Sequence, residues 1–198
     1  MSPLPDCTGA LVAGGKATRL GGAAKGLLRA GGEPIAARSL RLFGELFAGA
    51  LIVANDPAPY AALGAPIVAD VVAGKGAPGG LHAALAAAPT PWVFTAGCDM
   101  PFLSREGILL LAARREGVEA VIVEWQGRLE PLHAFWSRAC LPYVARRLAD
   151  GDPSLQSLGR GVRAAIVREG DWRAVDPEGR AFENANTPAD AARLGLER

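Results

Sequence analysis

The stretch LVAGGKATRLGGAAKGLL, residues 11–28, decides the fold class of this chain. A short apolar run ends here in a glycine-rich loop that carries Arg19 and Lys25. Glycine lets the backbone approach phosphate oxygens and turn its N–H groups toward them, while the two cationic side chains neutralise negative charge. In an open α/β sheet, such a loop leaves the carboxyl end of the first strand, where these sheets bind ligands. The stretch therefore predicts a nucleotide site at the edge of a parallel sheet.

The spacing of this loop matches neither of two familiar phosphate-binding patterns. Lys25 is followed by Gly26, which excludes GxxxxGK[ST], and the loop has no GxGxxG with an acidic residue about 20 positions on. Taken alone, the loop leaves a purely structural turn as an alternative.

The remainder of the chain alternates between strand-like and helix-like segments, which predicts a single Rossmann-like α/β domain over residues 1–198. Its sheet is expected to be mostly parallel, with helices on both faces. Residues 1–7 are expected to be a disordered N-terminus. Weaker alternation after about residue 119 indicates an antiparallel excursion at one sheet edge. Strands are expected near residues 8–13, 50–54, 66–69, 92–97, 119–124 and 131–136.

Helix signals fall between these strands. Pro34 at a first-turn position and an apolar stripe predict a helix over residues 34–47, and a second helix is expected from about Gly79. Ser104 is a good N-cap for a third helix. Near the end of the chain, Thr187 is expected to cap a last helix that has Pro188 in its first position.

Composition narrows the class of protein further. The 198 residues carry 21 Lys and Arg against 20 Asp and Glu, a net charge of +1 that gives no reason to expect nucleic acid or an anionic membrane as partner. No segment approaches the ~20 apolar residues of a membrane span, and the first ten residues do not resemble a signal peptide, so a cytoplasmic protein is expected. Three widely spaced cysteines predict reduced thiols.

Several motifs together resemble those of the molybdenum cofactor guanylyltransferases, a branch of the Rossmann-like nucleotidyltransferases. The opening loop is similar to the family signature LAGGxxxRMGxxK. The other landmarks occur in the family's order over roughly residues 9–192, so the resemblance covers nearly the whole chain. They are IVAND (52–56), IVAD (67–70), GAPGGLHAAL (76–85), GCDMPFLS (97–104), EPLHAFW (130–136) and FENANTPAD (182–190).

The resemblance implies an enzyme that transfers GMP from GTP to the terminal phosphate of a molybdopterin-type cofactor, releasing pyrophosphate. Because that nucleophile is already ionised, catalysis is expected to come from aligning two anions and stabilising charge on the pyrophosphate. Arg19 and Lys25 would hold the triphosphate together with the backbone of Gly14, Gly15 and Gly22. Asp99 would bind Mg²⁺, a hard ion that prefers oxygen.

Further residues carry over onto the nucleotide and pterin sides. Val12 and Ala13 would line the base together with Gly14, and Asn55 could read a base or ribose edge. Asp70 would assist nucleotide or metal binding, with a capping role as the alternative. Asn184 and Asn186 correspond to the element that receives the pterin phosphate, although Asn186 also reads as a turn or cap residue.

Other side chains near these motifs receive simpler interpretations. Arg19 could be a solvated surface arginine, and Asp99 a cap ahead of Pro101. Glu130 is a candidate for the same cleft, whereas His133 and His82 are expected to be packed rather than catalytic. Cys98 has no accompanying base, so it is interpreted as buried filler.

Two departures from the family pattern bear on detailed contacts. Val53 stands where relatives often carry a polar residue, and Gly97 stands where proline is usual. Three readings of function remain. The first is the GTP-using enzyme, with cofactor-delivery proteins or molybdoenzyme chaperones as possible partners. The second is a CTP-using cytidylyltransferase of the same fold acting on molybdopterin or a sugar-alcohol phosphate, and the third is a non-catalytic nucleotide or cofactor carrier.

Overall fold

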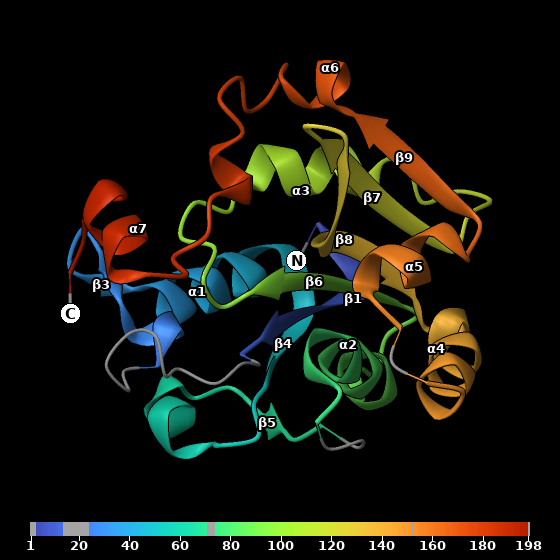
Figure 1. The fold of residues 1–198 in the computed structure, drawn as a ribbon, viewed down its shortest axis with the longest axis horizontal. Helices are drawn as coiled ribbons and strands as arrows, with labels where there is room; N and C mark the ends of the chain where they lie inside the picture. Colours follow the sequence, from blue (N-terminus) through green and yellow to red (C-terminus); the bar gives the residue numbers. More distant parts are fainter. Residues whose placement is uncertain (1–2, 14–23, 71–73, 152, 198) are drawn as a thin grey trace.

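The computed structural model describes residues 3–13, 24–70, 74–151 and 153–197. They form one α/β domain built on a seven-stranded sheet with the strand order β5-β4-β1-β6-β8-β7-β9 (Figure 1). These strands are β1 (Leu4–Val12), β4 (Phe47–Val53), β5 (Ile67–Val68), β6 (Trp92–Gly97), β7 (Ala120–Trp125), β8 (Arg128–Ser137) and β9 (Ala164–Arg168). Four of the six pairs of neighbouring strands are parallel, which confirms the expected mostly parallel sheet.

The strand directions explain where a ligand would bind. β1 pairs in parallel with β4 on one side and with β6 on the other. The chain first builds outward from β1 to β4 and β5, and then returns to place β6 on the opposite side of β1. This reversal between β1 and β6 is a topological switch point, and open α/β sheets bind ligands outside the strand ends at such a point.

β8 supplies the expected antiparallel excursion, since it runs antiparallel to both β6 and β7, but it lies inside the sheet between these two strands and not at the edge. Its register with β7 is interrupted between Ile122 and Glu124. Beyond β7, β9 returns to parallel pairing. The sequence interpretation did not include β9.

Helices cover both faces of the sheet (Figure 1). On one face lie α1 and α3, which bury a cluster containing Phe43, Phe94 and Phe135; on the other lie α2, α4 and α5. The helices are α1 (Ile35–Leu46), α2 (Gly76–Ala87), α3 (Arg105–Ala112), α4 (Leu141–Ala149), α5 (Leu155–Arg160), α6 (Glu169–Trp172) and α7 (Pro188–Arg193), with short 3-10 turns at η2 (Lys25–Leu27), η3 (Ala58–Leu63), η4 (Arg138–Cys140) and η5 (Arg180–Phe182).

The close approach of α1 to the sheet depends on Gly9 in β1. A Cβ atom at Gly9 would lie 2.5 Å from the ring of Phe43 and 2.8 Å from that of Phe47. A side chain at this position would displace both phenylalanine rings, so Gly9 is a packing glycine.

The predicted helix caps are confirmed. The Ser104 side chain accepts a hydrogen bond from the Gly107 N–H and begins α3. Thr187 and Asp190 form a reciprocal capping box at the start of α7, with Pro188 in its first turn.

A small second sheet contains the C-terminal strand. Its order is β10-β2-β3, with β2 (Arg29–Ala30), β3 (Glu33–Pro34) and β10 (Leu196–Glu197). These strands have two residues each, too short for a periodic pattern, and the sequence did not predict them.

The expectation that residues 1–7 are disordered is wrong for the residues of this segment that belong to a strand. Residues from Leu4 onward belong to β1, where Leu4 aligns with Phe47 and Cys7 with Trp92. Cys7 is fully buried, which explains why this segment is held on the sheet. No helix within the described part of the chain is long and apolar enough to span a membrane.

Candidate functional site

The ends of three parallel strands lie level with one another at the switch point. Val12 aligns with Val53 of β4 and with Gly97 of β6, and the ladder extends one residue further because Ala13 N donates to Val53 O at 2.8 Å. The segments that leave these strands therefore start from one edge of the sheet. They carry Asn55 and Asp99, two of the residues singled out from the sequence.

Lys25 and Asp99 meet at this edge. The Lys25 Nζ lies 3.0 Å from Asp99 Oδ2, and the two side chains are 23% and 21% exposed. A partly buried contact of this kind between opposite charges is a charge-assisted hydrogen bond. The two residues are 74 positions apart, so the fold brings Lys25 and the CDMP segment together.

Gly97 leaves room for the Asp99 carboxylate. A Cβ atom at Gly97 would lie 2.7 Å from Asp99 Oδ1, and the Gly97 N–H points to the Met100 sulfur at 3.3 Å. The departure from the usual proline thus has a local consequence: the chain turns tightly here, and the carboxylate folds back over the end of β6.

The C-terminal segment reaches the same place. Lys25 Nζ donates to Asn186 Oδ1 at 2.6 Å, and Ala185 N donates to Asp99 O at 2.9 Å. Asn186 therefore contacts the cationic group of the loop. Asn184 instead donates its amide to Phe182 O at 2.8 Å, within its own turn.

Asn55 and Asp70 join the ends of β4 and β5. Asn55 Nδ2 donates to Asp70 Oδ2 at 3.1 Å, and Asp70 N donates to Asn55 Oδ1 at 2.9 Å. This reciprocal pair ties two strand ends together, a structural role that differs from the cap considered as the alternative for Asp70. Val53, by contrast, packs in the core beneath α2 and takes no part in this edge.

Gly80 brings α2 against the end of β1. A Cβ atom at Gly80 would lie 2.6 Å from a methyl carbon of Val12 and 3.9 Å from Asp70 Oδ1. The sequence contained a signal for this contact, namely the paired glycines of GAPGGL, but Gly80 was not singled out. Asp70 thus lies close to the helix that flanks the switch point.

Four of the proposed site residues lie outside the described part of the chain: Gly14, Gly15, Arg19 and Gly22. Their contacts with a triphosphate stay predictions from the sequence.

The donor set suits a magnesium ion that is shared with a substrate. Within residues 3–13, 24–70, 74–151 and 153–197, no cluster of three or more His, Cys, Asp or Glu side chains could enclose an ion. Mg²⁺ is commonly bound through one or two carboxylates together with substrate phosphates and water. The partly exposed Asp99 carboxylate fits that pattern.

The packed interpretations of the nearby thiol and imidazole are confirmed. Burial raises the pKa of the Cys98 thiol to about 12, so it is not a nucleophile at neutral pH. His133 is fully buried in edge-to-face contact with Phe94, Trp172 and Phe182. Burial lowers its pKa to about 3, which keeps the imidazole neutral.

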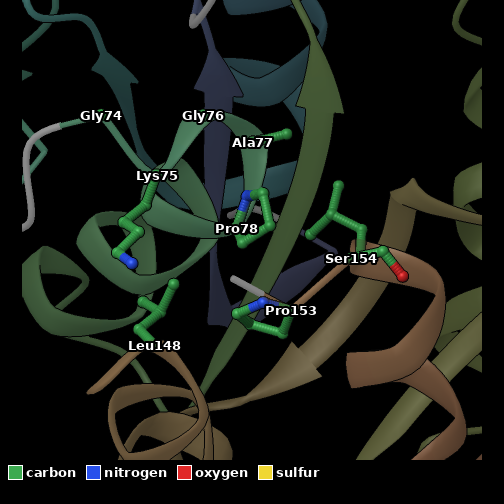
Figure 2. A pocket seen from close by; sticks show the side chains of 9 residues that line it. Gly74, Lys75, Gly76, Ala77, Pro78, Leu148, Pro153 and Ser154 are labelled. Atoms are coloured by element: carbon green, nitrogen blue, oxygen red, sulfur yellow. The ribbon is translucent and has the colours of Figure 1, made fainter. Parts of the chain in front are cut away.

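A hollow of about 380 Å³ opens beside the start of α2 (Figure 2). Leu148, Pro153 and Leu155 give it an apolar wall, and the first turn of α2 forms the other side. Lys75 donates to Gly151 O at 3.1 Å across this region. The hollow lies at the start of the helix whose Gly80 contacts Val12.

A family model described as the MobA-like NTP transferase domain matches residues 9–168. The chain belongs to this family.

Curated relatives match this chain over nearly its whole length. A molybdenum cofactor guanylyltransferase from Burkholderia ambifaria is 38% identical over 200 residues, covering 98% of this chain and 97% of the relative. A second protein of that name, from Desulfosudis oleivorans, is 31% identical over 181 residues, covering 91% and 90%.

Solved structures share the fold. The molybdopterin-guanine dinucleotide biosynthesis protein A from Archaeoglobus fulgidus superposes with a TM-score of 0.80 at 24% identity, covering 94% of this chain and 96% of that chain. A 2-C-methyl-D-erythritol 4-phosphate cytidylyltransferase from Thermus thermophilus gives 0.63 at 20% identity, covering 93% and 95%. Proteins whose names refer to guanine and to cytidylyl nucleotides therefore share this fold, so the fold alone does not determine which nucleotide is used.

Proposed function

We propose that this MobA-like NTP transferase transfers GMP from GTP to the terminal phosphate of a molybdopterin-type cofactor. The observation that carries the proposal is the convergence of Lys25 and Asp99, 3.0 Å apart, at the switch point of the sheet. Curated relatives named molybdenum cofactor guanylyltransferase, at 31% and 38% identity, support this acceptor and this base over the CTP-using alternative.

In the proposed reaction, an oxygen of the acceptor's terminal phosphate attacks the α-phosphorus of GTP. The bond from that phosphorus to the bridging oxygen breaks, and pyrophosphate leaves with the electron pair. The acceptor oxygen is already ionised, so no side chain has to remove a proton from it. The protein's work is to align two anions and to stabilise the charge that grows on the leaving group.

Lys25 is the described residue best suited to that charge. Its ammonium group has three N–H donors on a flexible stem, so it can follow an oxygen as negative charge builds there. Arg19 and the glycine backbone of residues 14, 15 and 22 would add donors around the same phosphates. Val12 and Ala13 would line the base at the end of β1, and Asn55 the base or ribose.

Asp99 would hold Mg²⁺, which supplies charge neutralisation at the triphosphate when bound. The carboxylate is suited to this because the tight turn at Gly97 fixes it at the end of β6. Asn184 and Asn186 would face the acceptor phosphate, since asparagine offers donors without repelling an anion.

The test is pyrophosphate release from purified protein supplied with molybdopterin-type cofactor, Mg²⁺ and either GTP or CTP. We expect release with GTP and little with CTP. Release with CTP in preference to GTP would replace guanylyl transfer with cytidylyl transfer, and nucleotide binding without any release would indicate a carrier. Omitting the cofactor gives the control for simple hydrolysis.

A further inference from the structure

The C-terminal segment clamps the chain that carries Lys25. We call residues 184–197 the C-terminal clasp. Its strand β10 pairs antiparallel with β2, so that Leu196 aligns with Ala30. Between them, Leu28 packs in one small core with Ala185 and Ala191. The stretch directly after Lys25 is thus held by residues more than 150 positions later in the sequence.

Asn186 is the point where the clasp contacts the Lys25 side chain. Its Oδ1 accepts a hydrogen bond from Lys25 Nζ at 2.6 Å. Because an ammonium group can only donate, this contact also fixes which end of the amide faces Lys25. The Nδ2 group therefore points away from the ammonium.

The backbone on both sides of this contact is anchored independently of Lys25. Asn186 N donates to Asp190 Oδ2 at 3.1 Å, as part of the acidic cap that begins α7. Ala185 N donates to Asp99 O at 2.9 Å. Asn186 consequently presents its oxygen from a fixed frame, and the flexible partner in the contact is Lys25.

Lys25 has two anchors of different chemistry. Asp99 is charged and neutralises the ammonium, whereas the Asn186 oxygen is neutral and leaves the positive charge intact. A cation and a lysine compete for one carboxylate, so binding of a metal–nucleotide complex at Asp99 would remove the charged anchor. The amide oxygen would still hold one of the three ammonium hydrogens, leaving two for phosphate oxygens.

From this arrangement, and resting on the proposed function, we infer that Asn186 is a positioning residue for Lys25. It keeps the ammonium group directed at the triphosphate when the metal–nucleotide complex takes over Asp99. This assigns Asn186 a role on the nucleotide side of the site, in addition to the acceptor side suggested by its motif. Through it, the C-terminal clasp contributes to nucleotide binding.

The experiment measures the Kd of GTP with Mg²⁺ in the absence of any acceptor. We expect Asn186→Ala to weaken binding roughly three- to tenfold, the scale of losing one typical hydrogen bond at a solvent-exposed position. In a Lys25→Ala background the same substitution should have no further effect, because its only route to the nucleotide is through the ammonium group. A residue that touches the acceptor alone would leave both Kd values unchanged.

Glu183→Gln is the matched control. Glu183 directly precedes the C-terminal clasp and pairs with Arg193 at the surface, so the substitution should leave the Kd of GTP unchanged. Asn186 is exposed and its backbone bond to Asp190 does not need the side chain, so the variant should melt like the parent.

The outcomes separate this inference from the proposed function. GTP binding by the parent with an unchanged Kd in Asn186→Ala overturns the inference alone, as does an equal loss in the parent and Lys25→Ala backgrounds. Failure of the parent to bind GTP overturns the proposed function and the inference with it.

Discussion

Asp99 shows how a single residue acquires a role from its surroundings. Its backbone carbonyl accepts a hydrogen bond from Ala185 N, and its Oδ2 accepts one from Lys25 Nζ. Its Oδ1 lies beside Gly97, which has no side chain to displace it. Asp99 is therefore held in place by Lys25, by the C-terminal clasp and by the end of its own strand. Such a preorganised charge is what a phosphoryl-transfer site requires.

Removing that charge gives the first residue-scale prediction. Asp99→Asn keeps the size of the side chain but loses the charge that pairs with Lys25 and would bind Mg²⁺. We expect turnover to fall roughly 10²-fold, the scale of losing one preorganised electrostatic contact. The measurement is the rate of pyrophosphate release at saturating GTP across a Mg²⁺ titration.

Asp171→Asn provides the control for this substitution. Asp171 is an exposed aspartate that pairs with Arg114 at 3.8 Å on α6, so its loss should not affect turnover. If Asp99→Asn turned over at the parent rate at every Mg²⁺ concentration, Asp99 would have no metal role.

At the scale of elements, the sequence predicted what depends on local pattern. The strands near residues 92–97 and 119–124, the helix over residues 34–47 and the caps at Ser104 and Thr187 follow from periodicity and side-chain chemistry within a few positions. The predicted convergence of Lys25 and Asp99 at one sheet edge follows from parallel topology.

What the sequence could not predict are features made by distant pairing. The strand β10 has two residues and forms by pairing with β2. In this pair Leu196 aligns with Ala30, which lies 166 positions earlier in the sequence. The contact of Asn186 with Lys25 spans 161 positions and has no local signature. Asn55 and Asp70 likewise pair through their positions at two neighbouring strand ends, which tertiary structure alone brings together.

Replacing either of two glycines by alanine should change the stability of the protein, but in opposite directions. Gly44 lies in an exposed position of α1 with no atom within 4 Å of an added Cβ, whereas an added Cβ at Gly9 would meet Phe43 at 2.5 Å. We expect Gly44→Ala to stabilise the protein by about 0.5–1 kcal/mol through helix propensity. Gly9→Ala should destabilise it by about 1–3 kcal/mol through overpacking.

Urea unfolding of the two variants measures both effects. Each substitution adds one methyl group, so each variant serves as the control for the other. A stabilising Gly9→Ala would mean that Phe43 and Phe47 can move off β1 without cost, contrary to the tight packing of α1 on this strand.

At the scale of the whole molecule, the fold buries His133 and half-buries Glu130 on β8, with opposite consequences for pH dependence. Burial lowers the pKa of His133 to about 3 and raises that of Glu130 to about 7. Both groups are thus neutral in part of the pH range where they would be charged in the unfolded chain. Stability rises with pH wherever the unfolded chain binds more protons than the folded one.

For His133, the imidazole becomes protonated below a pKa of 6.5 in the unfolded chain, whereas in the folded protein its pKa is about 3. Stability from this group is therefore fully present above pH 6.5 and is lost as the pH falls toward 3. For Glu130, the folded protein keeps a proton up to about 7 that the unfolded chain releases near 4.5, so this group lowers stability as the pH rises between those values. The two contributions oppose each other in the region where they overlap.

Single substitutions should separate these contributions. We expect His133→Phe, which keeps an aromatic ring among Phe94, Trp172 and Phe182, to reduce the loss of unfolding free energy below pH 6.5 by several kcal/mol. Glu130→Gln should instead remove the falling contribution of this group, so that the unfolding free energy of the variant has a more positive slope than that of the parent between pH 4.5 and 7. Urea unfolding from about pH 4 to about pH 8 measures both, and the comparison uses slopes, so a uniform cost of repacking does not matter. Curves for His133→Phe that run parallel to those of the parent would show that the imidazole titrates alike in the folded and unfolded states, and that its aromatic surroundings do not exclude the charged form.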